Sequence, residues 1–156
     1  MSSASDLPSS RIAILLVESD PTGRQQTLAA LSKAGAQSAI VAAADGVEAL
    51  DYLHGRGAHA SRDTRKQPRL VLLDTELPGM DGLAVLKAIR GDPRTRAVPV
   101  VMLTATTERR TLDSCYAGGA NSVVRKTTDP AELLRKMTKV HDFWMYVNEG
   151  DRPSRV

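Results

Sequence analysis

The sequence predicts a doubly wound α/β fold, in which helices cover both faces of a parallel sheet. Two observations predict it. Five short apolar runs alternate along the chain with five amphipathic stretches, and the apolar runs are continuous rather than alternating with polar residues. Continuous apolar character is typical of strands that are buried on both faces. With 156 residues, the chain is long enough to bury the core of one such domain.

The expected elements follow one another as strand and helix throughout. The apolar runs predict strands at 12–17, 39–43, 70–73, 98–103 and 122–124. The amphipathic stretches predict helices at 22–34, 47–54, 83–90, 108–117 and 131–147.

Two of the helix starts are marked by capping residues. Asp20-Pro21 and Asp129-Pro130 each offer an N-cap followed by proline at the first helical position. Glu132 stands three residues after Asp129, where the second member of a capping box belongs. No internal repeat divides the chain, so we expect one domain over 11–148. The Ser-rich start and the GDRPSRV end predict a disordered tail at 1–10 and a tail at 149–156.

Composition narrows the class of protein. The chain is 42% apolar and 25% charged with a net charge of +3, which is ordinary for a soluble globular protein. Five basic residues and one acid fall between Gly55 and Arg69, but no aromatic residue interleaves with the basic residues, which favours a solvated loop over a nucleic-acid site. The lone Cys115 excludes an internal disulfide and is expected in the core. No apolar run reaches the roughly 18 residues of a membrane span, and the first ten residues lack a signal-peptide core, so a cytoplasmic location is expected.

Polar residues follow four of the predicted strands. Glu18 and Asp20 end the first, Asp74 the third, Thr104 the fourth and Lys126 the fifth. In a parallel sheet these residues meet at one edge, where ligands of doubly wound folds bind. Clustered carboxylates require neutralisation, and Mg²⁺ suits a site with few carboxylates. A carboxylate beside a metal, a lysine and a hydroxyl can accept a phosphoryl group.

The motifs at these strand ends resemble a known family. VLLDTELPGMDG, VVMLTA, GGANSVVRK and the opening LLVESDP occur in the order and at the spacing of receiver domains of two-component response regulators. The resemblance implies a flavodoxin-like sheet with strand order 2-1-3-4-5 and five helices. It implies that the chain catalyses only its own phosphorylation and dephosphorylation. It also implies roles for individual residues: phosphoacceptor Asp74, phosphoryl-binding Lys126, switch hydroxyl Thr104, and a Mg²⁺ site at Glu18, Ser19, Asp74 and the backbone of Glu76.

A narrower group within the family is more similar still. The long basic loop before the third strand, the run GDPRTRAVPVVMLT, the segment CYAGGANS and a last helix ending in HDFWMYV resemble small single-domain regulators paired with bacterial phytochrome kinases. The resemblance implies a stand-alone regulator that takes phosphate from a histidine kinase, binds neither nucleic acid nor membrane, and acts through protein contacts.

The chain also departs from the family pattern. Ser19 stands where the family carries the acid that binds the metal directly, Thr127 replaces a usual proline, and Val123 replaces an aromatic switch residue. A pseudo-receiver, which is an interaction module with weak or no metal-dependent phosphorylation, is therefore an alternative. A haloacid-dehalogenase-type phosphatase is a weaker one, because that family places its two-acid motif after the first strand, whereas Asp74 follows the third.

Asp20 and the last helix leave two questions open. Asp20 is expected to cap the first helix, but it lies two residues from Glu18 and could replace the missing acid. Leu133, Met137, Val140, Trp144 and Val147 form a heptad-like stripe. Three of the five aromatic residues crowd the end of that helix, which indicates a partner surface. The resemblance to the narrower group implies that the partner is a second copy, that is, a homodimer through the last helix and this aromatic segment. The three histidines lack ligand spacing and are expected to be surface or packing residues.

Overall fold

The computed structural model describes residues 12–35 and 40–149, which form a five-stranded parallel sheet with order β2-β1-β3-β4-β5. The sequence prediction of the fold class and of the strand order is thus confirmed. The strands are β1 (Ile14–Val17), β2 (Ile40–Ala43), β3 (Leu70–Asp74), β4 (Val100–Thr104) and β5 (Ser122–Arg125). The expected tail at 1–10, all but the first residue of the tail expected at 149–156, and the predicted start of β2 at Ala39 lie outside the described residues.

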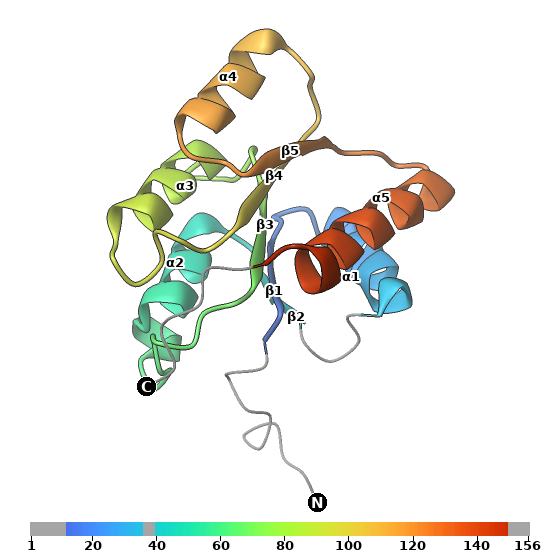
Figure 1. The fold of residues 1–156 in the computed structure, drawn as a ribbon. Coiled ribbons are helices and arrows are strands. Elements are labelled where there is room, and N and C mark those ends of the chain that lie inside the picture. The colour runs from blue at the N-terminus through green and yellow to red at the C-terminus, as the bar shows by residue number, and fades with distance from the viewer. Residues whose placement is uncertain (1–11, 36–39, 150–156) are drawn as a thin grey trace, which may run out of the picture.

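Helices cover both faces of the sheet (Figure 1). In that figure α2 and α3 lie on one side of the strands, and α1 and α5 lie on the other. The helices are α1 (Pro21–Ala34), α2 (Gly46–His54), α3 (Gly82–Gly91), α4 (Arg109–Ala117) and α5 (Pro130–Asp142), with a short 3₁₀ turn η3 (Gly57–His59) and a π-helical turn η4 (Phe143–Val147). No helix within the described residues is long and apolar enough to cross a membrane.

The continuous apolar strands divide the core into two layers. Leu15 and Val17 of β1 pack against α2 and α3, whereas Ile14 and Leu16 pack against α1 and α5. All four side chains are fully buried, because successive residues of a strand point to opposite faces and both faces are covered. Cys115 is buried in the first layer, as expected.

Aspartate side chains cap three of the helices. Asp20 accepts the Gly23 N–H at 2.8 Å, and Asp45 and Asp81 make the same kind of contact at α2 and α3. Each contact satisfies one of the free N–H groups of a helix start.

The capping box predicted at α5 is wrong. The Asp129 N–H, to which Glu132 would have to bind, is donated instead to Thr127 Oγ1 at 3.1 Å, and the Asp129 carboxylate makes no cap contact. Glu132 turns to Lys136, with 3.4 Å between Oε1 and Nζ.

The last helix also ends earlier than predicted. Its α-helical part stops at Asp142, and η4 is bounded by a hydrogen bond from the Asn148 N–H to the Phe143 carbonyl. A π turn holds more residues than an α-helical turn, so it rotates the end of the heptad-like stripe away from the core. Val147, the last residue of that stripe, is 63% exposed, and Met145 is buried instead. Arg69, at the start of β3, donates to the Met145 carbonyl at 2.9 Å and ties this segment to the sheet.

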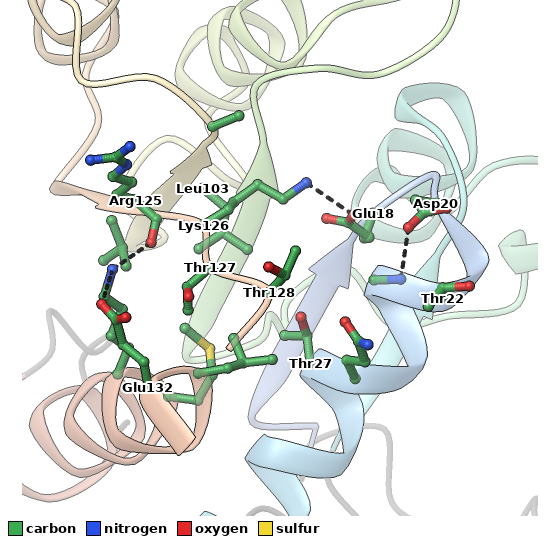
Figure 2. A pocket seen from close by; sticks show the side chains of 17 residues that line it. Glu18, Asp20, Thr22, Thr27, Leu103, Arg125, Lys126, Thr127, Thr128 and Glu132 are labelled. Atoms are coloured by element: carbon green, nitrogen blue, oxygen red, sulfur yellow. Dashed lines mark hydrogen bonds and ion pairs between the residues drawn. The ribbon is translucent and has the colours of Figure 1, made fainter. Parts of the chain in front are cut away.

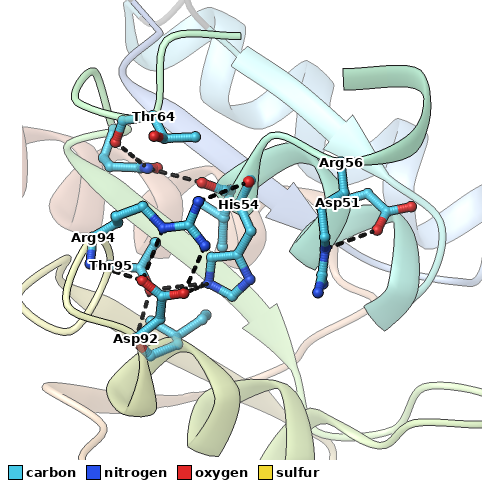
Figure 3. A network of polar contacts seen from close by, with 10 residues as sticks. Asp51, His54, Arg56, Thr64, Asp92, Arg94 and Thr95 are labelled. Carbon is cyan, nitrogen blue, oxygen red and sulfur yellow. Dashed lines mark hydrogen bonds and ion pairs between the residues drawn. The ribbon is translucent and has the colours of Figure 1, made fainter. Parts of the chain in front are cut away.

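A polar network joins the end of α2 to the loop that follows α3 (Figure 3). His54, at the end of α2, contacts Thr95 Oγ1 at 3.3 Å, and Arg94 joins the His54 carbonyl to the Asp92 carboxylate. Burial lowers the pKa of His54, which favours the neutral ring. His54 and His141 are both buried packing residues, in agreement with the sequence interpretation.

Candidate functional site

The predicted site residues meet at the carboxyl edge of the sheet. β1 leads into Glu18, β3 ends in Asp74, β4 ends in Thr104 and β5 leads into Lys126. All of these strands run parallel and are neighbours in the order β1-β3-β4-β5, so their ends converge. Glu18, Asp74 and Thr104 are almost fully buried, with 1%, 3% and 1% of their surface exposed.

Lys126 joins the two carboxylates. Its Nζ lies 2.7 Å from Asp74 Oδ2 and 3.1 Å from Glu18 Oε1, and Figure 2 shows the side chain reaching across to Glu18. Burial alone would lower the pKa of Lys126, but the two carboxylates outweigh burial and hold that pKa above its usual value. The lysine is therefore a fixed positive charge beside Asp74.

The second oxygen of Asp74 is held by the backbone. Asp74 Oδ1 accepts the Glu76 N–H at 2.9 Å, while the Glu76 side chain is exposed. A side chain at Gly82 would place its Cβ 2.2 Å from the Asp74 carbonyl oxygen, so only glycine lets α3 start this close to the acceptor strand. Sequence reasoning missed Gly82, although the LPGMDG motif contains it.

The surroundings of Glu18 disfavour its charged form. Burial and the neighbouring Asp74 carboxylate raise the pKa of Glu18 to about 7, although Lys126 opposes this shift. Its Oε2 is buried and has no hydrogen-bond partner within the described part of the chain. A Cβ at Gly23 would lie only 2.7 Å from Glu18 Oε1, so the glycine leaves room for this carboxylate.

The loop after β1 shows one of the two roles considered for Asp20. Asp20 is exposed and caps α1 through the Gly23 N–H, as expected. Arg24, which sequence reasoning missed, donates to the Glu18 carbonyl at 2.9 Å and so braces the loop between β1 and α1. Only the structure reveals that contact, because nothing in the sequence marks this arginine as different from other helix-surface arginines.

Thr104 completes the edge. Its Oγ1 accepts the Thr106 N–H at 3.2 Å, which holds the hydroxyl at the turn after β4. Val123, at the position where an aromatic residue was expected, is partly buried against the layer that includes α2 and α3.

The donor set suits a divalent cation that keeps most of its water. No group of three or more His, Cys, Asp or Glu side chains able to hold a metal occurs among the described residues. Two carboxylates nevertheless face a single ammonium, and Glu18 Oε2 has a free lone pair without a donor. Mg²⁺ typically uses one or two carboxylates and several waters, so these residues fit such an ion.

Comparison with known proteins agrees with this geometry. Residues 14–138 match the response regulator receiver domain family. The chain is 35% identical over 143 residues to a probable methanogenesis regulatory protein, FilR2, from Methanothrix harundinacea, and this match covers 90% of this chain and 88% of the relative.

Two single-domain regulators are similar in structure. The bacteriophytochrome response regulator AtBRR is 40% identical, with a TM-score of 0.68 and coverage of 88% of this chain and 97% of AtBRR. The Mn²⁺-bound form of response regulator Rcp1, a protein of Synechocystis sp., is 25% identical, with a TM-score of 0.79 and coverage of 89% and 98%. The chain belongs to the response regulator receiver domain family and is related to the single-domain regulators associated with phytochromes.

Proposed function

We propose that Asp74 accepts a phosphoryl group from the phosphohistidine of a sensor histidine kinase. Receiver domains work with such kinases, and the bacteriophytochrome regulator among the neighbours suggests a phytochrome kinase as the donor. The observation that carries the proposal is the contact of Lys126 Nζ with Asp74 Oδ2 at 2.7 Å, at a strand end where Asp74 is 3% exposed.

The transfer uses Asp74 as the nucleophile. A carboxylate oxygen forms the new O–P bond while the N–P bond of the phosphohistidine breaks, and the imidazole nitrogen takes up a proton. Lys126 stabilises the phosphoryl oxygens as a point charge, and Thr104 Oγ1 contacts the phosphorylated product from the neighbouring strand end. The Glu76 N–H holds Asp74 so that one carboxylate oxygen stays oriented.

Mg²⁺ is the proposed cofactor. Glu18, Asp74 and the Glu76 carbonyl would hold it, and the Ser19 position contributes no carboxylate to the set. When bound, the ion supplies positive charge that offsets the charge of the acids and of the phosphoryl oxygens. The orphaned Oε2 of Glu18 supports this assignment, as does the Mn²⁺-bound Rcp1 among the neighbours.

The phosphorylated protein is proposed to signal through contacts with other proteins and not with nucleic acid. It is proposed to catalyse only its own phosphorylation and dephosphorylation. The alternative, a pseudo-receiver, predicts a damaged pocket. The complete contact set of Lys126 with both acids favours phosphorylation.

Phosphotransfer from a labelled kinase tests the proposal. A bacteriophytochrome kinase that is first autophosphorylated with radiolabelled ATP should lose label to this chain within minutes when Mg²⁺ is present. Label that stays on every kinase tried would contradict the assigned function.

Replacing Ser19 with aspartate should tighten Mg²⁺ binding by about tenfold. Unit charges about 4 Å apart interact by roughly 4 kcal/mol at an effective dielectric of 20, and repulsion from the existing acids removes much of that gain. Calorimetry of Mg²⁺ binding measures the change. Asp20→Asn is the matched control and should leave Mg²⁺ affinity unchanged, because an amide still caps α1. Equal Mg²⁺ affinity in wild type and Ser19→Asp would refute the role given to Ser19.

We also propose a homodimer through the end of α5 and η4. Phe143, Tyr146 and Val147 are 45%, 75% and 63% exposed, and together they form an apolar end. Trp144 is partly buried against the core, so Tyr146 is the better probe. Tyr146→Ser should weaken dimerisation roughly 30-fold, which corresponds to about 2 kcal/mol for a central aromatic anchor.

Sedimentation equilibrium measures this effect. Val47→Ser on α2, where Val47 is 56% exposed, is the matched control and should leave the dimer intact. A wild-type protein that is monomeric at micromolar concentration would rule the dimer out.

A further inference from the structure

The first turn of α1 contacts Glu18 from two directions. Arg24 donates from its guanidinium to the Glu18 carbonyl at 2.9 Å, and a Cβ on Gly23 would lie 2.7 Å from Glu18 Oε1. The turn therefore binds the backbone of Glu18 through one residue and borders its carboxylate through the other. Figure 2 shows Glu18 and Asp20 beside this turn, with the Asp20 carboxylate joined to the backbone of the turn.

The backbone of Glu18 is fixed on both sides. Its N–H donates to the Ala43 carbonyl at the end of β2 at 3.1 Å, and its carbonyl accepts from Arg24. Because both backbone groups are bonded, the side chain leaves the chain in one direction. It is 1% exposed, and its Oε1 lies 3.1 Å from Lys126 Nζ. Loss of the Arg24 contact would free the side of Glu18 from which the loop to α1 starts.

Arg24 occupies a position that is unfavourable for a cation. It is the fourth residue of α1, whose first turn carries no acid, and a positive charge near a helix N-terminus opposes the helix dipole. Long side chains on a helix lean toward its N-terminus, which brings the guanidinium back to Glu18, six residues earlier. The same nitrogen lies 3.5 Å from the Ser19 carbonyl. The loop carbonyls therefore account for an arginine at this position, whereas the helix does not.

The orientation of Glu18 matters more here than in a site with two adjacent acids. Ser19 contributes no carboxylate, and Asp20 caps α1. Glu18 is thus the one acid of this loop that is proposed to hold Mg²⁺. Metal ligands that are oriented by contacts outside the metal site bind more tightly, and loss of such a contact typically weakens binding about 10- to 100-fold. Residues that hold Glu18 should therefore affect Mg²⁺ affinity directly.

We propose that Arg24 and Gly23 are positioning residues of the magnesium site. Arg24 fixes the backbone of Glu18, and Gly23 leaves the space that the Glu18 carboxylate needs. These roles rest on the proposed function, because they exist only if Mg²⁺ binds at Glu18. A purely electrostatic role of Arg24 predicts the opposite effect: a guanidinium near the ion repels it, so removal of Arg24 would tighten Mg²⁺ binding. The sign of the change separates the two roles.

Calorimetric titration with Mg²⁺ tests the proposal on three variants. Arg24→Gln removes the carbonyl contact together with the charge and should weaken Mg²⁺ binding about tenfold. Arg24→Lys keeps a charged donor, and because the native contact uses a single nitrogen it should restore the affinity to within about threefold of wild type. Gly23→Ala should also weaken binding about tenfold, because its Cβ displaces the Glu18 carboxylate, although alanine favours the helix.

Arg94→Gln is the matched control. It loses the same charge and also a guanidinium contact to a backbone carbonyl, that of His54 at 3.1 Å, but in the loop after α3. It should leave Mg²⁺ affinity unchanged. Urea denaturation without metal checks that each variant is folded. If Arg24→Gln does not fold, Gly23→Ala decides alone, and unchanged Mg²⁺ affinity in that variant would refute the proposal.

The wild-type titration separates this proposal from the proposed cofactor. If the wild type binds Mg²⁺ and Arg24→Gln binds it equally or more tightly, the positioning role is wrong and the proposed function stands. A wild-type protein that binds no Mg²⁺ would overturn the proposed cofactor and the positioning role with it.

Discussion

Asn at position 74 should abolish phosphoryl uptake while leaving the fold intact. The amide has nearly the same shape as the carboxylate, and its oxygen can still accept one of the two hydrogen bonds that Asp74 accepts, from Lys126 or from the Glu76 N–H. It is, however, a poor nucleophile, so no acyl phosphate can form. Intact mass after incubation with acetyl phosphate and Mg²⁺ should show one added phosphoryl group on the wild type and none on Asp74→Asn.

Asp81→Asn is the matched control for that experiment. Asp81 lies near the acceptor in the chain, but it is exposed and caps α3 through the Ala84 N–H, a role that asparagine keeps. It should be phosphorylated like the wild type. An Asp74→Asn protein that still gains phosphate would show that another residue is the acceptor.

Glu18 should make the metal-free protein less stable as the pH rises. Burial and the neighbouring Asp74 raise its pKa from 4.5 to about 7, so between these values the folded state binds more protons than the unfolded state. Its stabilising contribution is complete below about pH 4.5 and is lost as the pH rises through 7. A shift of this size corresponds to at most roughly 3 kcal/mol.

Glu18→Gln tests this because glutamine does not titrate. Relative to the wild type, the variant should gain up to roughly 3 kcal/mol of unfolding free energy between about pH 5 and pH 8. Urea denaturation without metal measures the difference. Glu108→Gln, at an exposed position without a cap contact, should show no such trend. A pH-independent difference for Glu18→Gln would mean that Glu18 is not protonated in the folded state near neutral pH.

The fold could be predicted because its signals are local. Apolar runs such as 14–17 can be buried on both faces only in a covered parallel sheet, and the carboxyl ends of parallel strands share an edge. These two rules are enough to place Glu18, Asp74 and Lys126 together.

The wrong predictions arise where another hydrogen bond or another helix type replaced the expected one. The Asp129 N–H had a nearer acceptor in Thr127, so the capping box at Glu132 could not form. The π turn at 143–147 changed which residue of the stripe reaches the core, which helical spacing alone cannot reveal.

Close backbone approach was also invisible in the sequence. Gly23 and Gly82 matter because of atoms that a Cβ would meet, and at Gly82 these are backbone atoms. Arg24 matters because the loop carbonyl of Glu18 lies within its reach. Such contacts depend on the packed geometry of helix against strand end, which only the structure supplies.

The most direct test of the central claim is the chemical nature of the bound phosphate. The wild-type protein, treated with acetyl phosphate and Mg²⁺, should gain one phosphoryl group by intact mass. Neutral hydroxylamine should remove it, because an acyl phosphate on Asp74 is cleaved by that nucleophile whereas a phosphate ester on a threonine or serine is stable. No gain in mass, or a gain that survives hydroxylamine, would contradict the account.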